Sequence, residues 1–170
     1  MAVGAPGGAD IDPDTFRRAL GRVPTSVSVI AASTSEGPAG LVVGSLVSVS
    51  LVPPLVGIFV SDTSTSWPRI EAAGTFTANV LAHDQRELCA RFARPGGAKF
   101  RGLTWCTSPL GNPLLPGVTG WIDCTLREVL RIGDHWLAVG HVECVGEGGG
   151  GPPLVHHKGL LRALAPHGEP

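Results

Sequence analysis

The segment TGWIDCTLREVLRIGDHWLAVGHVECVG, residues 119–146, decides the fold class of this chain. It contains two long stretches typical of β-strands, 119–131 and 135–146, joined by Ile132-Gly133-Asp134. A short turn with glycine and aspartate between two such stretches predicts a β-hairpin. Because a hairpin joins antiparallel strands, the segment predicts an antiparallel sheet.

The sequence on both sides of this hairpin adds further short strands separated by turn residues. Strands are expected at 27–31, 41–51 with a bend near Gly44-Ser45, 55–60, 75–81 and 154–164. Consecutive hairpins disfavour a Rossmann sheet, which needs a helical crossover between parallel strands. The chain is therefore predicted to be mainly β with flanking helices, as a closed or nearly closed antiparallel barrel.

Two or three short helices are expected beside these strands. The first should begin at Pro13 with Asp12 as its N-cap, present Phe16, Ala19 and Leu20 on one face, and end at Gly21. A short helical turn is expected at 68–73, and Asp84 should cap a helix carrying Leu88, Cys89 and Phe92. The long connection 95–118 is of a length usually associated with function or with contacts between subunits.

Length and composition limit the class of protein. The chain has 170 residues with 43% hydrophobic and 16% charged residues, which indicates one globular domain, expected at 11–165 with tails at 1–10 and 166–170. Thirteen Lys and Arg against fourteen Asp and Glu give no overall basic charge for nucleic acid or an anionic membrane. No apolar run approaches the about 20 residues that span a bilayer, and the first residues do not resemble a signal peptide. A cytoplasmic protein is expected.

Cysteine and histidine spacing gives no metal motif. Cys89, Cys106, Cys124 and Cys144 are never closer than 17 positions, so the sequence has no C-x-x-C pair, and four reduced, mostly buried thiols are expected. The histidines, including His141 and the pair 156–157, have no acidic or cysteine partner at ligand spacing. No metal site is predicted.

Hydroxyl side chains mark the candidate binding regions. Ser45, Ser48 and Ser50 alternate along one stretch, which is typical either of a solvent-facing edge strand or of a groove where small walls admit a flat ring. The loop SDTSTS, residues 61–66, is either an ordinary turn or a nest for a phosphate. Four cations at 91, 94, 99 and 101 are either a solvated face or partners for that phosphate.

The order of several segments adds a resemblance. These are FRRALGRVPTSVSVIAA (16–32), GSLVSVSLVPPLV (44–56), FTANVL (76–81), RFA with KFRG (91–102), GDH with GHV (133–142) and PLVHHKG (153–159). Together they resemble the flavin reductase family of split-barrel flavoproteins, NAD(P)H:flavin oxidoreductases that form the reductase component of two-component flavin-dependent monooxygenases.

The resemblance implies a homodimer of split β-barrels that binds FMN or FAD without a covalent link and uses NADH or NADPH as co-substrate. It implies delivery of diffusible reduced flavin to a separate monooxygenase, and no side chain that acts as acid, base or nucleophile, because hydride passes directly between the cofactors. His135 corresponds to a histidine near the nicotinamide. The residues that correspond to flavin contacts are Pro24, Thr25, Ser26, Val27, Val43, Gly44, Ser45, Leu46, Ser48, Ser50, Leu51, Ser64, Ser66, Asn79, Phe92 and Lys99.

Three positions depart from the family pattern. Ser26 stands where glycine is usual, Gly44 where asparagine is common, and Val52 where aspartate usually precedes Pro53-Pro54. These departures keep open a flavin-dependent oxygenase or oxidase that acts directly on an organic substrate. The small size of the chain and its unremarkable set of acid and base side chains keep open a non-enzymatic module that binds flavin or haem.

Overall fold

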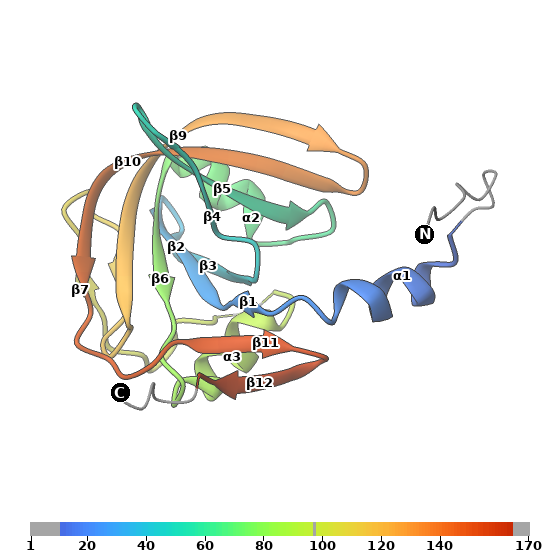
Figure 1. The fold of residues 1–170 in the computed structure, drawn as a ribbon. Helices are drawn as coiled ribbons and strands as arrows, with labels where there is room; N and C mark the ends of the chain where they lie inside the picture. Colours follow the sequence, from blue (N-terminus) through green and yellow to red (C-terminus); the bar gives the residue numbers. More distant parts are fainter. Residues whose placement is uncertain (1–10, 97, 165–170) are drawn as a thin grey trace.

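The computed structural model describes residues 11–96 and 98–164, so the predicted tails at 1–10 and 166–170 lie outside the described residues. The larger sheet of the described residues is antiparallel and has seven strands (Figure 1). Across the sheet the strands lie in the order β3 (Gly37–Val43), β2 (Ser28–Thr34), β6 (Thr75–Val80), β9 (Gly120–Ile132), β10 (His135–Glu147), β5 (Pro54–Ser61) and β4 (Val47–Leu51).

The hairpin of β9 and β10 lies at the centre of this sheet. Its pairing runs from Ile132 opposite His135 at the turn to Gly120 opposite Glu147 at the open end. Gly133 has a φ of 62°, the left-handed conformation that a tight turn favours in glycine. Since β9 also pairs with β6 and β10 with β5, the predicted hairpin joins the two halves of the sheet, and this prediction is confirmed.

A second, three-stranded sheet has the order β1 (Thr25–Ser26), β11 (Leu154–His157) and β12 (Leu160–Ala163). The prediction of one final strand over 154–164 is wrong, because the chain reverses at Lys158 and Gly159. These two residues have φ values of 51° and 75°, so both take the left-handed conformation of a tight hairpin turn. A third pair, β7 (Cys106–Thr107) with β8 (Pro113–Leu114), lies within the otherwise irregular 95–118 connection.

The bend predicted near Gly44-Ser45 is present, since β3 ends at Val43 and β4 begins at Val47. The sheets do not close into a complete hydrogen-bonded cylinder: β3 and β4 are the two edges of the seven-stranded sheet. The described residues are mainly β with three short helices and form a split barrel, so the predicted fold class is confirmed.

The helices are α1 (Pro13–Leu20), α2 (Trp67–Ala73) and α3 (Arg86–Ala93). The α1 prediction is confirmed, because Asp12 accepts a hydrogen bond from the Thr15 amide at 2.9 Å as its N-cap. Asp84 is not the cap of α3, which is a correction: the cap position is Gln85, whose side chain does not cap the helix. The Gln85 amide instead accepts from the Ala82 N–H and donates to the Pro116 carbonyl, which ties the loop before α3 to the 95–118 connection.

Two apolar clusters share β2 as their common wall. Ile30 and Ala32 belong to a cluster that also contains Trp67 and Ile70 of α2, whereas Val29 and Ala31 belong to a cluster with Phe92 of α3. Because successive strand side chains point to opposite faces, these two clusters bury β2 on both of its faces. The predicted strand at 27–31 is confirmed from Ser28 onward.

The cysteine prediction holds only in part. All four thiols are free, but only Cys124 is buried: Cys106 is exposed, and Cys89 and Cys144 are partly exposed. Cys124 lies on β9 in the middle of the sheet, where its side chain points into the core, while the other three lie on elements that reach the surface. None of the described helices is long and apolar enough to cross a membrane.

Candidate functional site

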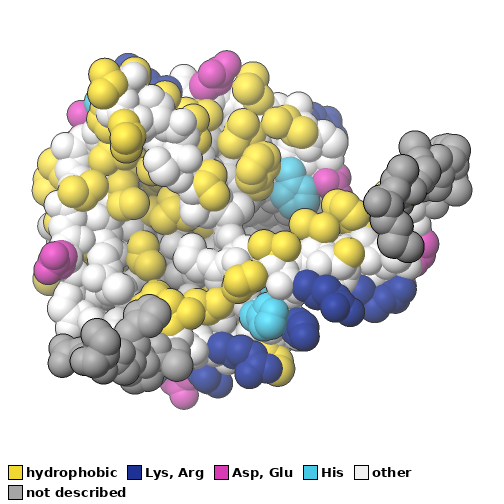
Figure 2. Space-filling model, viewed as in Figure 1, with side chains coloured by type: hydrophobic (Ala, Val, Ile, Leu, Met, Phe, Trp, Pro, Cys, Tyr) yellow, Lys and Arg dark blue, Asp and Glu magenta, His cyan; other side chains and the backbone are white. Residues whose placement is uncertain are grey.

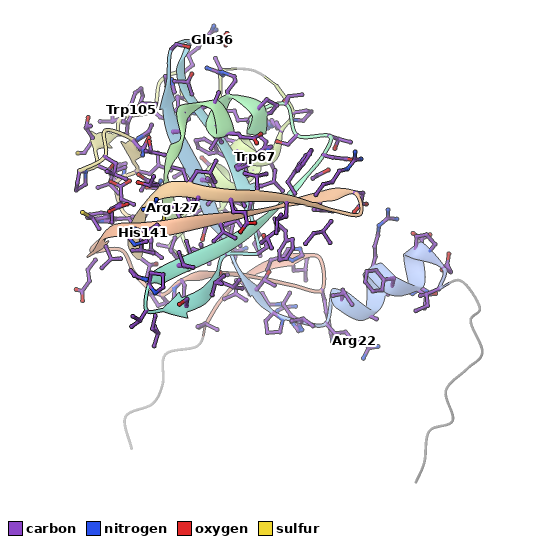
Figure 3. The ribbon with its side chains drawn as sticks, turned by 90° about the horizontal axis from the view of Figure 1, so that it is seen from above. Arg22, Glu36, Trp67, Trp105, Arg127 and His141 are labelled. Carbon is purple, nitrogen blue, oxygen red and sulfur yellow. The ribbon has the colours of Figure 1, made fainter. Side chains whose placement is uncertain are left out.

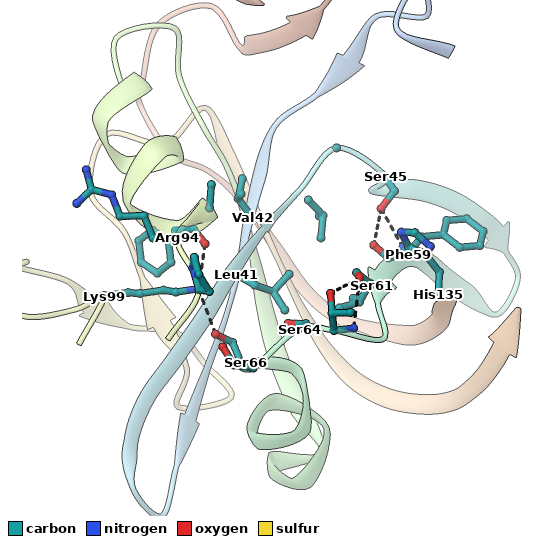
Figure 4. A pocket seen from close by; sticks show the side chains of 18 of the residues that line it. Leu41, Val42, Ser45, Phe59, Ser61, Ser64, Ser66, Arg94, Lys99 and His135 are labelled. Atoms are coloured by element: carbon teal, nitrogen blue, oxygen red, sulfur yellow. Dashed lines mark hydrogen bonds between the residues drawn. The ribbon is translucent and has the colours of Figure 1, made fainter. Parts of the chain in front are cut away.

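A hollow among the described residues has a volume of about 710 Å³. It lies where the ends of β3 and β5, the loop 61–66, the C-terminal end of α3 and the β9–β10 turn meet (Figure 4). This volume falls within the range of cofactor and small-molecule sites. Strand ends and loops from five distant parts of the sequence therefore form one candidate site.

The floor of the cavity is apolar. Leu41, Val42 and Val43 come from β3, and Phe92 of α3 also lines the cavity. Phe92 is only 1% exposed and packs edge to face against Phe100, with ring centroids 5.0 Å apart. A Cβ on Gly40 would lie 2.6 Å from the Phe92 ring, so only glycine allows this packing. Phe92 therefore shapes the cavity mainly as a core residue.

Lys99 contributes a positive charge next to the floor. Its Nζ donates to the Gly40 carbonyl at 3.1 Å, the Phe92 carbonyl at 3.0 Å and Ser66 Oγ at 3.2 Å (Figure 4). Partial burial lowers the pKa of this ammonium group from its ordinary value. All three N–H bonds are directed to protein oxygens, so Lys99 acts on a ligand through its charge, while Arg94 at the rim is exposed.

The loop 61–66 lines the cavity with hydroxyl groups. Ser61 Oγ and Thr63 Oγ1 are 2.8 Å apart, and Ser64 Oγ accepts from the Trp67 amide at 3.3 Å, which starts α2. Thr65 Oγ1 accepts from the Gly96 amide at 3.0 Å. The loop is thus held to α2 and to the segment after α3, and hydroxyl groups remain along its inner side.

The opposite wall is formed by the bend between β3 and β4. Ser45 Oγ accepts from the Phe59 N–H at 2.9 Å and donates to the Phe59 carbonyl at 3.1 Å, so it replaces a backbone partner for β5. A Cβ on Gly44 would lie 2.9 Å from Thr25 Oγ1. The missing side chain at position 44 therefore lets β1 approach the bend, and Thr25 presents its side chain to the cavity.

His135 lies at the rim of the cavity. Its Nδ1 is 2.7 Å from Asp134 Oδ1, and its side chain is 45% exposed. The hydrogen bond and the charge of His135 lower the pKa of Asp134, to which the charge of Arg17 on α1 also contributes. The turn is fixed to the hydroxyl loop, because the Asp62 N–H donates to the Asp134 carbonyl at 3.0 Å. The aspartate thus orients the imidazole beside the opening.

Comparison with known proteins shows what this geometry belongs to. The profile of the Flavin reductase like domain matches residues 20–165. The chain belongs to the flavin reductase family. It is 47% identical over 133 residues to a flavin reductase of Pseudomonas putida, covering 78% of each chain. It is 40% identical over 163 residues to the reductase subunit HsaB of a flavin-dependent monooxygenase of Rhodococcus jostii, covering 96% of this chain and 84% of that one.

Solved structures of flavin reductases have the same fold. A nitrilotriacetate monooxygenase component B homologue of Mycobacterium thermoresistibile superposes with a TM-score of 0.86 at 36% identity, covering 92% of this chain and 89% of that one. The NADH:FAD oxidoreductase SgcE6 of Streptomyces globisporus, in complex with NAD and FAD fragments, gives 0.86 at 29% identity, covering 95% of this chain and 100% of that one. The predicted family and split-barrel fold are confirmed.

The structure brings together nine of the residues that the family resemblance suggested. One group comes from β1 and from the end of β3 with the bend that follows it. The other group comes from the loop 61–66, from α3 with the segment after it, and from the β9–β10 hairpin. They are Thr25, Val43, Gly44, Ser45, Ser64, Ser66, Phe92, Lys99 and His135.

Eight others lie outside the lining of this cavity. Asn79 is fully buried on β6, where its amide donates to the Val29 and Pro113 carbonyls and its oxygen accepts from the Leu115 N–H. Its bonds stay within the protein. Val27 lies in the core, Ser26 pairs with Val155 in the small sheet, and Leu46 packs on the first apolar cluster. The remaining four are exposed or partly exposed: Pro24, Ser48, Ser50 and Leu51.

Sequence reasoning included Ser61 in the hydroxyl loop but did not single out Phe59 and Val60. These residues line the cavity because β5 lies beside β10 and its last residue, Ser61, pairs with His135. In the structure Phe59 is 41% exposed between the buried Ile58 and Val60. A large apolar side chain turned outward in a buried strand indicates a contact surface.

Proposed function

We propose that this protein is an NAD(P)H-dependent flavin reductase that supplies reduced FMN or FAD to a separate monooxygenase. The relatives that support this are a flavin reductase and the HsaB reductase subunit, together with the solved NADH:FAD oxidoreductase SgcE6. The observation that carries the proposal is the cavity itself, which joins an apolar floor, a hydroxyl loop with cations, and an open rim with His135.

The residues present fit a flavin. The apolar floor of β3 suits a flat aromatic ring, and the absence of a side chain at Gly44 lets the Thr25 hydroxyl approach the bend beside that floor. The hydroxyls of 61–66 with Lys99 and Arg94 suit a phosphate, since charged donors form the stronger bonds to anions. A non-covalent FMN or FAD is therefore the ligand we assign to this cavity.

When bound, the flavin supplies the hydride-accepting ring, and the chain's own residues position the two reactants. The β3 floor and the Thr25 side chain hold one face and edge of the ring, and Lys99 attracts its phosphate. His135, oriented by Asp134, binds the nicotinamide end of NADH or NADPH at the open rim. Holding both rings in contact contributes to rate by removing the entropy cost of their encounter.

No side chain serves as acid, base or nucleophile in this proposal. The polar lining groups are hydroxyls, Lys99, Arg94 and the rim histidine, and Lys99 is engaged by three protein oxygens. Because the reacting atoms belong to the two cofactors, binding and orientation are the work of the protein. This accounts for a site without a constellation of catalytic side chains in the described chain.

We also propose that the protein works as a homodimer. Phe16 and Leu20 of α1 are 54% and 52% exposed, and Leu51 and Val52 at the tip of β4 are 84% and 93% exposed. Exposed apolar groups of this size favour a protein–protein contact. Sedimentation equilibrium of the wild type should give the dimer mass, and Phe16→Asp should shift it toward the monomer.

Steady-state assays test the proposed function directly. NADH and NADPH are each combined with FMN, FAD and riboflavin, and oxidation of the nucleotide is followed by absorbance. Turnover with at least one pair and reduced flavin passed to an added acceptor are expected. Absence of nucleotide oxidation with every flavin would overturn the proposal. Tight flavin retention through gel filtration without turnover would favour the oxygenase alternative, and a haem spectrum would favour the binding module.

A further inference from the structure

A second hollow, of about 480 Å³, lies on the other side of the C-terminal end of α1. Its lining consists of Arg17, Arg18, Arg22 and Lys158, with Gly21 and Gly159 between them. No carboxylate contributes to this lining. Figure 2 shows Lys and Arg side chains gathered along α1 and the neighbouring small sheet, and Figure 3 shows Arg22 beside α1, away from the acidic Glu36.

Capping of α1 does not account for this group of cations. Basic residues in the last turn of a helix often serve its free carbonyl groups. Here backbone N–H groups already bond three of these carbonyl groups: Gly21 to Arg17 at 2.8 Å, Arg22 to Ala19 at 3.1 Å and Val23 to Leu20 at 3.0 Å. The arginine side chains are therefore not needed to complete the helix end.

The fourth cation, Lys158, comes from a distant part of the chain and is held against α1 by a backbone hydrogen bond. The Lys158 amide donates to the Gly21 carbonyl at 2.7 Å, which fixes the β11–β12 turn against the end of α1. Lys158 takes a φ of 51°, an unusual conformation for a residue with a side chain. Among residues 11–96 and 98–164, no carboxylate pairs within 4.0 Å with Arg18, Arg22 or Lys158.

This basic hollow adjoins the flavin cavity. Leu20, the last residue of α1, lines the main cavity, whereas Arg17 and Gly21 line the basic hollow, so one end of α1 separates the two. The charge of Arg17 also acts on Asp134, the partner of His135 at the rim, after the larger effects of His135 itself on the pKa of that carboxyl. A molecule whose ring lies at the rim can therefore extend a charged end toward these cations.

We infer that the hollow between α1 and the β11–β12 turn is an anion subsite for a phosphate of a nucleotide whose ring lies in the main cavity. Arg17 pairs with Asp14 at 2.9 Å. Arg18 and Arg22, which have no carboxylate partner among the described residues, suit this role, because a guanidinium group can give two parallel N–H bonds to a phosphate. The phosphate comes from one of two sources, the adenylate half of the pyridine nucleotide or that of FAD. The inference rests on the proposed function for the ring, but its own binding does not require turnover.

The test compares wild type with Arg22→Gln/Lys158→Gln by isothermal titration with ADP and with adenosine 2′,5′-bisphosphate. The matched control is Arg86→Gln/Arg162→Gln, two exposed cations that line a different hollow. The test pair should lower affinity for at least one of these ligands about tenfold, and the control should change it less than about twofold. Circular dichroism checks that both pairs fold.

The two probes and a flavin titration separate the sources. A larger loss for the 2′,5′-bisphosphate assigns the subsite to the 2′-phosphate of NADPH, and equal losses assign it to a diphosphate. A raised Kd for FAD with an unchanged Kd for FMN assigns it to the adenylate of the flavin. Absence of binding to wild type, or equal losses in the test and control pairs, overturns the inference. Since these titrations need no NAD(P)H oxidation, a failed reductase assay leaves their result unaffected.

Discussion

Two polar regions of this molecule differ in where their hydrogen bonds go. Around the fully buried Asp123 of β9, Thr77 donates to one carboxylate oxygen and the Leu110 N–H donates to the other at 2.8 Å. Asn112 of the same cluster accepts from the Ser33 N–H at 3.1 Å. This cluster holds the 95–118 connection against the sheet, and its bonds lie within the protein.

The main cavity keeps polar groups at its rim for a ligand. Lys99 and Ser45 are engaged by protein atoms on the inner side, whereas Arg94, Thr63 and His135 reach the opening. Buried polar groups must be paired inside the protein, since leaving one unpaired costs about 1–3 kcal/mol. Polar clusters whose hydrogen bonds are all made within the protein therefore stabilise the fold, while polar groups exposed at the rim remain available for binding.

The largest expected effect is that of Asp123→Ala. Removing this carboxylate leaves the Leu110 N–H and the Thr77 hydroxyl without their acceptor in a buried site, so the free energy of unfolding should fall by about 3 kcal/mol. Urea denaturation measures it. Asp62→Ala, which removes an exposed ion pair to Arg131, should cost less than about 1 kcal/mol. Similar losses in the two variants would contradict the distinction.

Lys99→Met tests the cavity side of the comparison. Loss of the charge should raise the Kd of FMN about tenfold and leave the Kd of riboflavin, which has no phosphate, within about twofold. Fluorescence quenching of each flavin measures both values. Arg101→Met is the control, because Arg101 is exposed and lies outside the cavity lining. Equal changes for FMN and riboflavin would show that Lys99 acts only through the shape of the floor.

The buried Cys124 thiol on β9 should make the stability of the protein depend on pH. Burial, and then the charges of Asp123 and Glu143, raise the pKa of this thiol from its ordinary value of 9.0 to about 12. The unfolded chain loses this proton at lower pH than the folded chain, so stability is fully present below about pH 9 and falls as pH rises toward 12.

Titration of this thiol should therefore lower the free energy of unfolding by about 1 kcal/mol when the pH rises from about 8 to about 10. Urea denaturation at both values measures the difference. Cys124→Ala should lose this part of the pH dependence, and Cys106→Ala, which changes an exposed thiol, should keep it. An unchanged slope in Cys124→Ala would contradict the assignment.

The smallest effect is expected for His135→Ala at the rim. The KM for the pyridine nucleotide should rise about threefold, because one contact at an exposed position is lost, while the Kd of the flavin stays within about twofold. Steady-state kinetics and flavin titration measure the two values. A loss of flavin affinity as large as the change in KM would place His135 against the flavin rather than the nicotinamide.

Local sequence signals predicted helices and strands more reliably than they predicted tertiary contacts. Helix α1 has its N-cap Asp12 and Pro13 as expected, yet none of its residues is buried. Helix α3 has no side-chain cap, yet it buries Phe92. Capping depends on neighbours in sequence, whereas burial depends on which elements pack together. For the same reason Asn79 fits a binding motif by sequence but lies among backbone carbonyls of two other segments.

The sequence by itself determined the antiparallel hairpin at 119–146, the bend at Gly44-Ser45, the first helix and the family, because these depend on neighbouring residues and on their order. Only the tertiary structure decided that Phe59 and Ser61 meet His135, and that Lys158 joins the arginines of α1. A period of two assigns strand side chains to a face but does not name the partner strand. Likewise, a balanced total charge does not reveal cations that folding gathers on one surface.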